Sequence, residues 1–431
     1  MPCNPSPWFY KHKLPESARR CSMSGESIAF LHASDLHLEQ PPYGMPEVPD
    51  HLRKILAEAP IQAAACVFET AILENVDFIL LAGDVIDPSS AGARQLAFLM
   101  EQFDLLREQR IAVYWIGGQI DGPDHWPEEL ALPDNVHRFP RGQVHQSLFR
   151  RNDHPIASII GISAGKDPVV DASVFRVEPS DRFTVAMAYG RAEASSLAAY
   201  KQIDYWALGG LHQSKTLFQS PQTAVYPGSP QGRSLSEAGV HGCTLARVER
   251  GRTAQTKFMP TDNVRWYRES IGAAEGTHRN DLQRILRDRM QRIVAEAGSS
   301  SILVAWQIET EGTLASQLRG GLDHELLDWL RTEFGRAQPA VWTMELTVTS
   351  SGELPEESYE EDTILGDFLR AVRQHQQDQR MPLDLATYLP QRGKDRTLAA
   401  VFDSNEDAMR SDLLEEAAAL GADLLRGEDV L

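Results

Sequence analysis

The stretch Phe30-Leu31-His32-Ala33-Ser34-Asp35-Leu36-His37-Leu38 decides the fold, because an apolar strand runs directly into an Asp-x-His pair. Open α/β sheets keep their functional residues at the carboxyl ends of the strands. Side chains alternate along an extended chain, so Asp35 and His37 are expected on the same side. A carboxylate and an imidazole placed in this way predict a metal site, although the same pair also occurs in solvated loops.

A second predicted strand covers residues 78–82 and ends in Gly83-Asp84-Val85-Ile86-Asp87, so two strands end in carboxylates. Apolar residues at helical spacing predict one helix over residues 52–75 and another over 93–109. A third strand is predicted over residues 111–116. The order strand, helix, strand, helix, strand predicts a layered α/β sheet.

Further strands are predicted along the rest of the first domain, at residues 158–162, 183–190, 205–212, 225–230 and 243–248. After them a strand, helix, strand, helix, strand pattern predicts a small α/β domain, with elements at residues 266–271, 280–297, 302–308, 324–334 and 342–349. An acidic tail follows, with predicted helices at residues 363–377 and 406–426.

The predicted division is a disordered extension at residues 1–23, a first domain at 24–262, a capping domain at 263–350 and a helical tail at 351–431. The extension is polar and aromatic without periodicity, and we expect translation to start at Met23. Apolar positions on the first tail helix predict a docking or packing face.

The composition describes a folded, acidic protein. The 431 residues are 42% hydrophobic and 24% charged, with a net charge of −19 and a pI near 5.1. This charge argues against broad electrostatic binding of nucleic acid, so any contact with DNA must be local, metal-assisted or made by a partner. The four cysteines are widely spread and show no C-x-x-C spacing, so neither a zinc knuckle nor a disulfide framework is predicted. A protein without disulfides is expected in the reducing cytoplasm. No run of about 18 apolar residues is seen, so no membrane span is expected.

The chain resembles the calcineurin-like metallophosphoesterases, and within them the SbcD-type nuclease subunits of DNA double-strand-break repair complexes. The resemblance covers about residues 27–350. It rests on the Asp35 and Asp84 stretches, Leu132-Pro133-Asp134-Asn135-Val136, and Tyr226-Pro227-Gly228-Ser229-Pro230-Gln231-Gly232-Arg233.

The resemblance implies a four-layer α+β metallophosphoesterase sandwich with a small α/β capping domain. It also implies two metal ions, usually manganese, held against a phosphodiester; iron or zinc would suit the same oxygen and nitrogen ligands. Family members work with a large SbcC-like SMC/ABC-type ATPase and commonly form homodimers through the first domain.

Matched position by position, the family pattern assigns Asp35, His37 and His212 to the first ion. It makes Asp84 the carboxylate that bridges both ions, and all four residues are present. Two ions would clamp the attacking and leaving oxygens of the phosphodiester.

The second ion's usual ligands, an Asn and two His, are replaced by Gln119, Tyr189 and Gly210. Gln119 keeps a carbonyl oxygen and Tyr189 could coordinate as a phenolate, but Gly210 offers no side-chain ligand. The family's general acid, a His, is replaced by Ile120, which cannot transfer a proton. Because general acid catalysis contributes roughly 10²–10⁴-fold, the site predicts reduced or absent activity.

Other candidates have structural interpretations beside the functional ones. Ser229 and Arg233 are candidates for contact with a phosphate, and a plain tight turn explains them equally well. Asp87 and Asp121 are interpreted as residues that hold their own turns. Three histidines are considered as replacements for lost ligands, but are better explained as surface or core residues: His32, His125 and His241.

Two functions are therefore weighed. In the first, the chain is a degenerate nuclease subunit in DNA repair that keeps one manganese ion for structure or for sensing DNA ends. It acts through an SbcC-like ATPase docked on the tail. In the second, it is an active metal-dependent phosphodiesterase that uses one ion or a rebuilt second site. An isolated small-molecule phosphatase is disfavoured by the tail.

Overall fold

The computed structural model describes residues 27–165, 169–178, 180–249, 253–274, 276–335, 337–349 and 356–377, with 414, 417–419, 421–422 and 425. The predicted extension at residues 1–23 and most of the predicted helix at 406–426 lie outside this set. The chain forms two compact units. The first unit comprises the chain up to Tyr267 together with Val294–Leu303 and Ala337–Met344. The second unit comprises Arg268–Ile293, Val304–Arg336 and the chain from Glu345. The predicted domain boundaries stay predictions.

The first sheet has six strands in the order β12-β11-β1-β2-β3-β4. Its parallel strands are β1 (Ile28–Ala33), β2 (Phe78–Ala82), β3 (Ala112–Ile116) and β4 (Val136–Arg138); β11 (Gly242–Val248) and β12 (Ala254–Pro260) continue it antiparallel. Leu31 lies opposite Ile79, so β1 and β2 end at the same edge. That register brings the turns after the two strands together.

The second sheet also has six strands, in the order β5-β6-β7-β8-β10-β9. The parallel strands are β6 (His154–Gly161), β7 (Phe183–Tyr189), β8 (Tyr205–Gly209) and β10 (Thr223–Tyr226), with β5 (His145–Arg151) and β9 (Lys215–Phe218) antiparallel at the edges. Strand β7 delivers Tyr189 at its end, and β8 is followed by Gly210 and His212.

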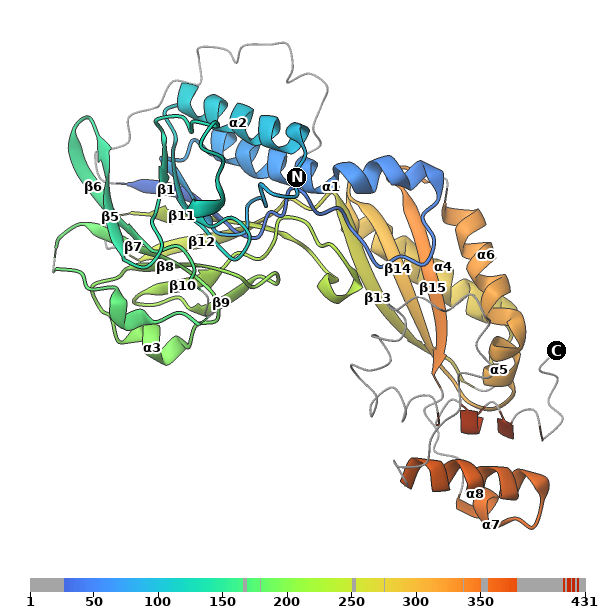
Figure 1. Ribbon diagram of the computed structural model, residues 1–431. Helices are drawn as coiled ribbons and strands as arrows, with labels where there is room; N and C mark the ends of the chain where they lie inside the picture. The colour runs from blue at the N-terminus through green and yellow to red at the C-terminus, as the bar shows by residue number, and fades with distance from the viewer. Residues whose placement is uncertain are drawn as a thin grey trace. The chain divides into compact units, whose positions relative to one another are not determined.

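The two sheets pack face to face with helices on both outer sides (Figure 1). Phe30, Phe78 and Tyr205 belong to the core between the sheets. Helices α1 (Asp50–Leu73) and α2 (Ala93–Glu108) cover the first sheet, and α3 (Ala194–Ala198) contributes to the core outside the second. Strands buried on both faces read as apolar runs in the sequence. The four layers confirm the predicted metallophosphoesterase fold class.

Helix α1 corrects one expectation from the sequence. Among the described helices it is long and apolar enough, by composition, to span a membrane, with a mean hydropathy of 1.4 in its most apolar window. Because 61% of that window is buried within the fold, its apolarity is explained by the core that it covers.

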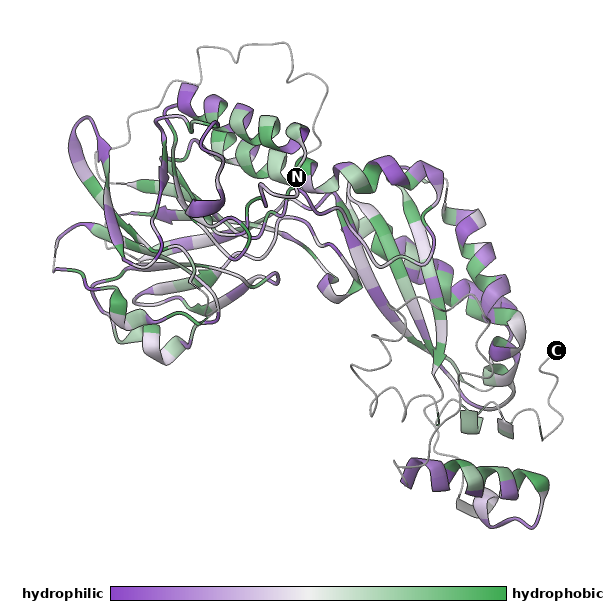
Figure 2. Ribbon diagram, in the orientation of Figure 1, coloured by the Kyte–Doolittle hydropathy of each residue, from purple (hydrophilic) through white to green (hydrophobic). Residues whose placement is uncertain are grey.

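A third sheet, β13-β14-β15, has three strands: β13 (Val264–Gly272), β14 (Ser301–Glu309) and β15 (Val341–Thr349). The helices of this region are α4 (Arg279–Ala297), α5 (Gly312–Gln317) and α6 (Asp323–Phe334). Figure 2 shows hydrophobic residues gathered in the strands and mixed with hydrophilic ones along the helices. The alternation of strands and helices agrees with the predicted small α/β domain.

The described part of the tail is helical. Helix α7 (Glu356–Glu360) is followed by α8 (Ile364–Gln377), close to the predicted 363–377. Leu365, Leu369 and Val372 of α8 are buried in a small core that also contains Leu414, Ala418 and Ala422. The apolar face of α8 is therefore covered, at least in part, by the tail itself.

Candidate metal centre

The candidate ligands lie in two tight turns with unusual backbone geometry. Asp35 and His37 follow β1 with φ angles of 55° and 43°, and Asp84 follows β2 with a φ of 51°. Left-handed backbone is uncommon for residues other than glycine, though Asp, Asn and His adopt it most readily, and such residues cluster at functional sites. The amides of Asp35 and His37 donate to the carbonyls of Gly83 (2.9 Å) and Asp84 (3.1 Å), which ties the turns together.

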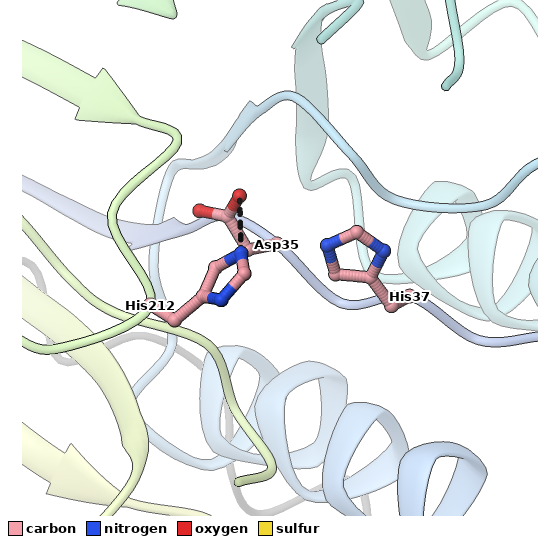
Figure 3. Close-up of side chains that lie close together, drawn as sticks. All are labelled: Asp35, His37 and His212. Atoms are coloured by element: carbon pink, nitrogen blue, oxygen red, sulfur yellow. Dashed lines mark ion pairs between the residues drawn. The ribbon is translucent and has the colours of Figure 1, made fainter. Parts of the chain in front are cut away.

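Asp35, His37 and His212 meet in one cluster, shown in Figure 3. One potential ligand atom from each lies within 4.8 Å of the others, and His212 Nε2 is 3.8 Å from Asp35 Oδ1. Asp35 Oδ1 and both ring nitrogens of His37 are buried without a hydrogen-bond partner in the described structure. Buried polar atoms almost always have partners. These orphaned atoms, with an oxygen and nitrogen donor set, fit a divalent metal ion.

Glu237 orients the His212 ring through a hydrogen bond to Nδ1, the ring nitrogen that does not face Asp35. His212 Nδ1 lies 2.7 Å from Glu237 Oε1, and this hydrogen bond raises the pKa of His212. Burial would raise the pKa of Glu237, but hydrogen bonds from His212 and Arg233 hold it at about 2. The ionised carboxylate accepts the Nδ1 proton, which leaves Nε2 for the metal. Metal-binding histidines are commonly oriented by such a carboxylate.

Asp84 lies beside this cluster with both carboxylate oxygens already hydrogen-bonded. Oδ1 accepts from the backbone amides of Gln119 (2.7 Å) and Ile120 (3.0 Å). Oδ2 accepts from the Tyr189 hydroxyl at 2.5 Å and is 3.8 Å from His37 Nε2. One oxygen of the predicted bridging carboxylate, Oδ2, thus faces both the first-ion cluster and the Tyr189 phenol.

Tyr189, which stands where the family pattern has a ligand of the second ion, packs its ring against three glycines. A Cβ atom built on Gly83 would lie 2.5 Å from the tyrosine ring, one on Gly118 2.8 Å and one on Gly210 3.0 Å. Burial, followed by the nearby Asp35 and Asp84, raises the pKa of Tyr189 far above its ordinary value. In the metal-free protein the residue is therefore a neutral phenol that donates a hydrogen bond to Asp84.

Asp121, interpreted from the sequence as a turn residue, organises the site. Its carboxylate accepts from the amides of Asp84 (3.0 Å) and Val85 (3.1 Å). It also accepts from Gly118 N (2.5 Å) and Trp115 Nε1 (2.8 Å). Asp121 therefore joins the turn after β3 to the turn that carries Asp84.

The other predicted residues divide into two groups. Gln119, Ile120 and Gly210 line a pocket of about 390 Å³ beside the cluster; its remaining lining residues are His37, Asp84, Tyr189, Gly190, Arg191 and His212. Ser229 and Arg233 do not line it. Ser229 is fully buried and donates its amide to the His212 carbonyl (2.9 Å), while Arg233 bonds to Gln40 (2.7 Å) and Glu237. Both support the turn that carries His212.

The three additional histidines lie away from the ligand cluster. His32 and His241 are buried and hydrogen-bonded, to the hydroxyl of Tyr205 and to Ser229 respectively. His125 is exposed, with Nδ1 3.2 Å from the carbonyl of Ile120. Sequence reasoning overlooked Glu237 and Arg191, because neither lies in a recognised ligand position; Arg191 follows Tyr189 by two residues, and that proximity was an available signal.

Comparison with known proteins agrees with this geometry. Residues 28–213 match the model of the calcineurin-like phosphoesterase family. The chain is 28% identical to the uncharacterized metallophosphoesterase YhaO of Bacillus subtilis, over 74% of this chain and 81% of that protein.

More distant similarity links the chain to two archaeal proteins named DNA double-strand break repair protein Mre11. Identity is 23% to that of Archaeoglobus fulgidus, over 49% of this chain and 52% of the relative. It is 24% to that of Aeropyrum pernix, over 50% and 56%. The match thus spans about half the length of these Mre11 proteins. Family model and four-layer fold agree that residues 28–213 form a calcineurin-like phosphoesterase domain, and the chain is similar to YhaO and, over about half its length, to Mre11.

Proposed function

We propose that this protein is an SbcD-like subunit of a cytoplasmic DNA repair complex that binds one divalent metal ion and hydrolyses phosphodiesters slowly or not at all. The contact between Asp84 Oδ2 and the Tyr189 hydroxyl, at 2.5 Å, carries the proposal. It occupies the carboxylate oxygen that a second ion would need. The Mre11 relatives, named for double-strand break repair, support the assignment to DNA repair.

Asp35, His37 and His212 would hold the ion. Asp84 Oδ2 lies 3.8 Å from His37 Nε2, and it would contact the ion only while also accepting the hydrogen bond of Tyr189. When bound, a divalent ion supplies Lewis acidity and lowers the pKa of coordinated water. Manganese is the proposed ion, with iron or zinc as alternatives that the same donors accept. Ile120 lines the pocket and has no acidic group that could protonate a leaving oxygen, which supports slow phosphodiester hydrolysis.

The proposed partner is an SbcC-like SMC/ABC-type ATPase, through which the subunit would reach DNA. Residues 351–431 are the proposed docking region, and a homodimer through the first domain remains part of the proposal. Since Leu365, Leu369 and Val372 are buried within the tail, docking would use other surfaces of α8.

A second candidate is an active phosphodiesterase that works with a single ion. The observation that favours it is the 390 Å³ pocket beside the ligand cluster, which leaves room for a substrate group. In this case the general acid would be a water molecule or a group on the substrate, because Ile120 cannot serve.

The deciding experiment counts metal ions and turnover in the same samples. The protein is loaded with manganese, freed of excess and measured by mass spectrometry of the metals, then assayed with bis(p-nitrophenyl) phosphate. One ion per chain with little hydrolysis supports the proposal; one ion with substantial hydrolysis favours the second candidate. Two ions would refute the single-ion proposal, mean that substitute ligands complete a second site and favour an active enzyme. An unchanged count in Asp35→Ala would refute the site assignment. Tyr205→Phe, an interior change away from the ligands, is the matched control.

A further inference from the structure

Arg191 places an unpaired positive charge in the pocket beside the metal cluster. It lines the same pocket as His37, Asp84 and His212, and its side chain is exposed. Within the part of the chain that the structure describes, the guanidinium forms no ion pair with a carboxylate. A guanidinium is always charged and presents a planar fork of donors that matches phosphate oxygens. Arg191 is therefore available to an anion that enters the pocket.

The backbone around Arg191 is held in place on both sides. The Tyr226 hydroxyl donates to the Gly190 carbonyl (2.8 Å) and accepts from the Ala192 amide (2.9 Å). The carbonyl of Arg191 itself accepts from the amide of Val170 (2.9 Å). The backbone that carries Arg191 is therefore held in place by hydrogen bonds, which is the arrangement expected of a binding residue.

Most other donors at the pocket are already used. The backbone amides of Gln119 and Ile120 donate to Asp84, and that of Gly210 donates to Asp35. An ion with two positive charges would be balanced by the carboxylates of Asp35 and Asp84. Arg191 then supplies the net positive charge that draws an anion into the pocket.

We propose that Arg191 binds a terminal phosphate group in this pocket, where the family's second ion would otherwise provide positive charge. The inference rests on the proposed function, since it assumes one ion at the Asp35 cluster. The guanidinium fork would pair with two phosphate oxygens, and a divalent ion held by Asp35, His37 and His212 would attract a further one. A terminal phosphate has three non-bridging oxygens, whereas an internal phosphodiester has two. The ligand class is therefore a phosphomonoester or free phosphate, at a nucleic-acid end or on a small molecule.

The first test is calorimetric titration of inorganic phosphate into metal-free and manganese-loaded protein. Charge-assisted hydrogen bonds predict that Arg191→Ala weakens binding about 10- to 100-fold in the loaded protein. Arg191→Lys keeps the charge but loses the fork, so its affinity should be intermediate. Arg176→Ala removes an exposed arginine outside the pocket and should bind like wild type. Equal affinities for the Arg191→Ala and Arg176→Ala proteins would overturn the proposal.

The second test separates the two sources of phosphate. Fluorescence anisotropy compares an oligonucleotide that carries a terminal phosphate with the same oligonucleotide ending in hydroxyls. Tighter binding of the phosphorylated end, lost in Arg191→Ala, identifies nucleic-acid ends as the ligand. Arg191-dependent binding of inorganic phosphate alone identifies a small phosphate. If neither probe responds to Arg191, the inference is wrong.

Metal counts on the same samples keep the two proposals distinguishable. Arg191→Ala should retain the wild-type ion count, because Arg191 is not among the metal ligands. A wild-type protein that holds no ion would refute the proposed function. The titrations in metal-free protein would still show whether Arg191 binds phosphate.

Discussion

Replacing Tyr189 by Phe tests the hydroxyl that occupies Asp84. The ring stays in its cradle of glycines, so no cavity forms, and only the 2.5 Å hydrogen bond to Asp84 Oδ2 is lost. Asp84 is 3% exposed, so water cannot readily replace the lost donor. Hydrogen bonds to charged groups are worth about 1.5–3 kcal/mol, so the metal-free variant should be less stable by that amount. At roughly 2–4 °C per kcal/mol, the melting temperature should fall by several degrees.

Metal should reverse this loss. A carboxylate oxygen freed from the phenol can turn to an ion, so manganese should raise the melting temperature of Tyr189→Phe more than that of wild type. Thermal unfolding with and without saturating manganese measures both effects. Tyr205→Phe is the control, because its hydroxyl lies 3.2 Å from the neutral His32 and far from any ligand. An equal metal response in all three proteins would refute the claim that Tyr189 competes for Asp84.

Three further changes test other parts of the site. The triple variant Ile120→His, Tyr189→His, Gly210→His should raise the manganese count from one to two per chain and increase phosphodiesterase activity; a count of one would mean that the loss of the second ion has another cause. Glu237→Gln should weaken metal binding about 10–100-fold, as second-shell changes do, which metal titration will measure. In metal-free wild type, the pKa of Glu237 near 2, below its ordinary 4.5, stabilises the fold fully above pH 4.5 and progressively less as the pH falls through 2. Glu237→Gln should lose that acid dependence in thermal unfolding, and an unchanged profile would contradict it. Asp121→Asn places an amide against four N–H donors, so a loss of about 1–3 kcal/mol of stability is expected in denaturant unfolding; a smaller loss would show that the turn does not need the carboxylate.

Most of the fold could be predicted from the sequence because parallel strands buried on both faces are continuous apolar runs. The strand at 78–82 was predicted with its observed bounds, and the helix at 93–109 within one residue. The edge strands β4, β5, β9 and β12 were missed. They are only partly buried, so their sequences lack the apolar signal that identifies the central strands.

The ligand cluster was predictable for a related reason. Asp35 and His37 of the cluster, and Asp84 beside it, come just after strands whose register is set by the sheet, so sequence position fixes their place. The environment of Tyr189 was not predictable, because it depends on three glycines from separate turns that meet only in the folded chain. Nor could the sequence show that Ser229 and Arg233 turn away from the pocket to support His212.

The departures from the family's second-ion pattern are physically coupled. Gly210 has a φ of 91° and lies against the Tyr189 ring, where an added Cβ would approach to 3.0 Å. A side chain at this position and the tyrosine ring therefore compete for the same space. Glycine at position 210 makes room for the tyrosine ring, in addition to lacking a ligand side chain. The tyrosine hydroxyl donates to the Asp84 oxygen that would have no partner without a metal ion. Without the tyrosine hydroxyl or an ion, the buried Oδ2 atom of Asp84 would be unpaired, at a cost of about 1–3 kcal/mol. The closed contact instead supports the proposal of a site that is stable with a single ion, and restoring one histidine alone should therefore fail to restore the second ion.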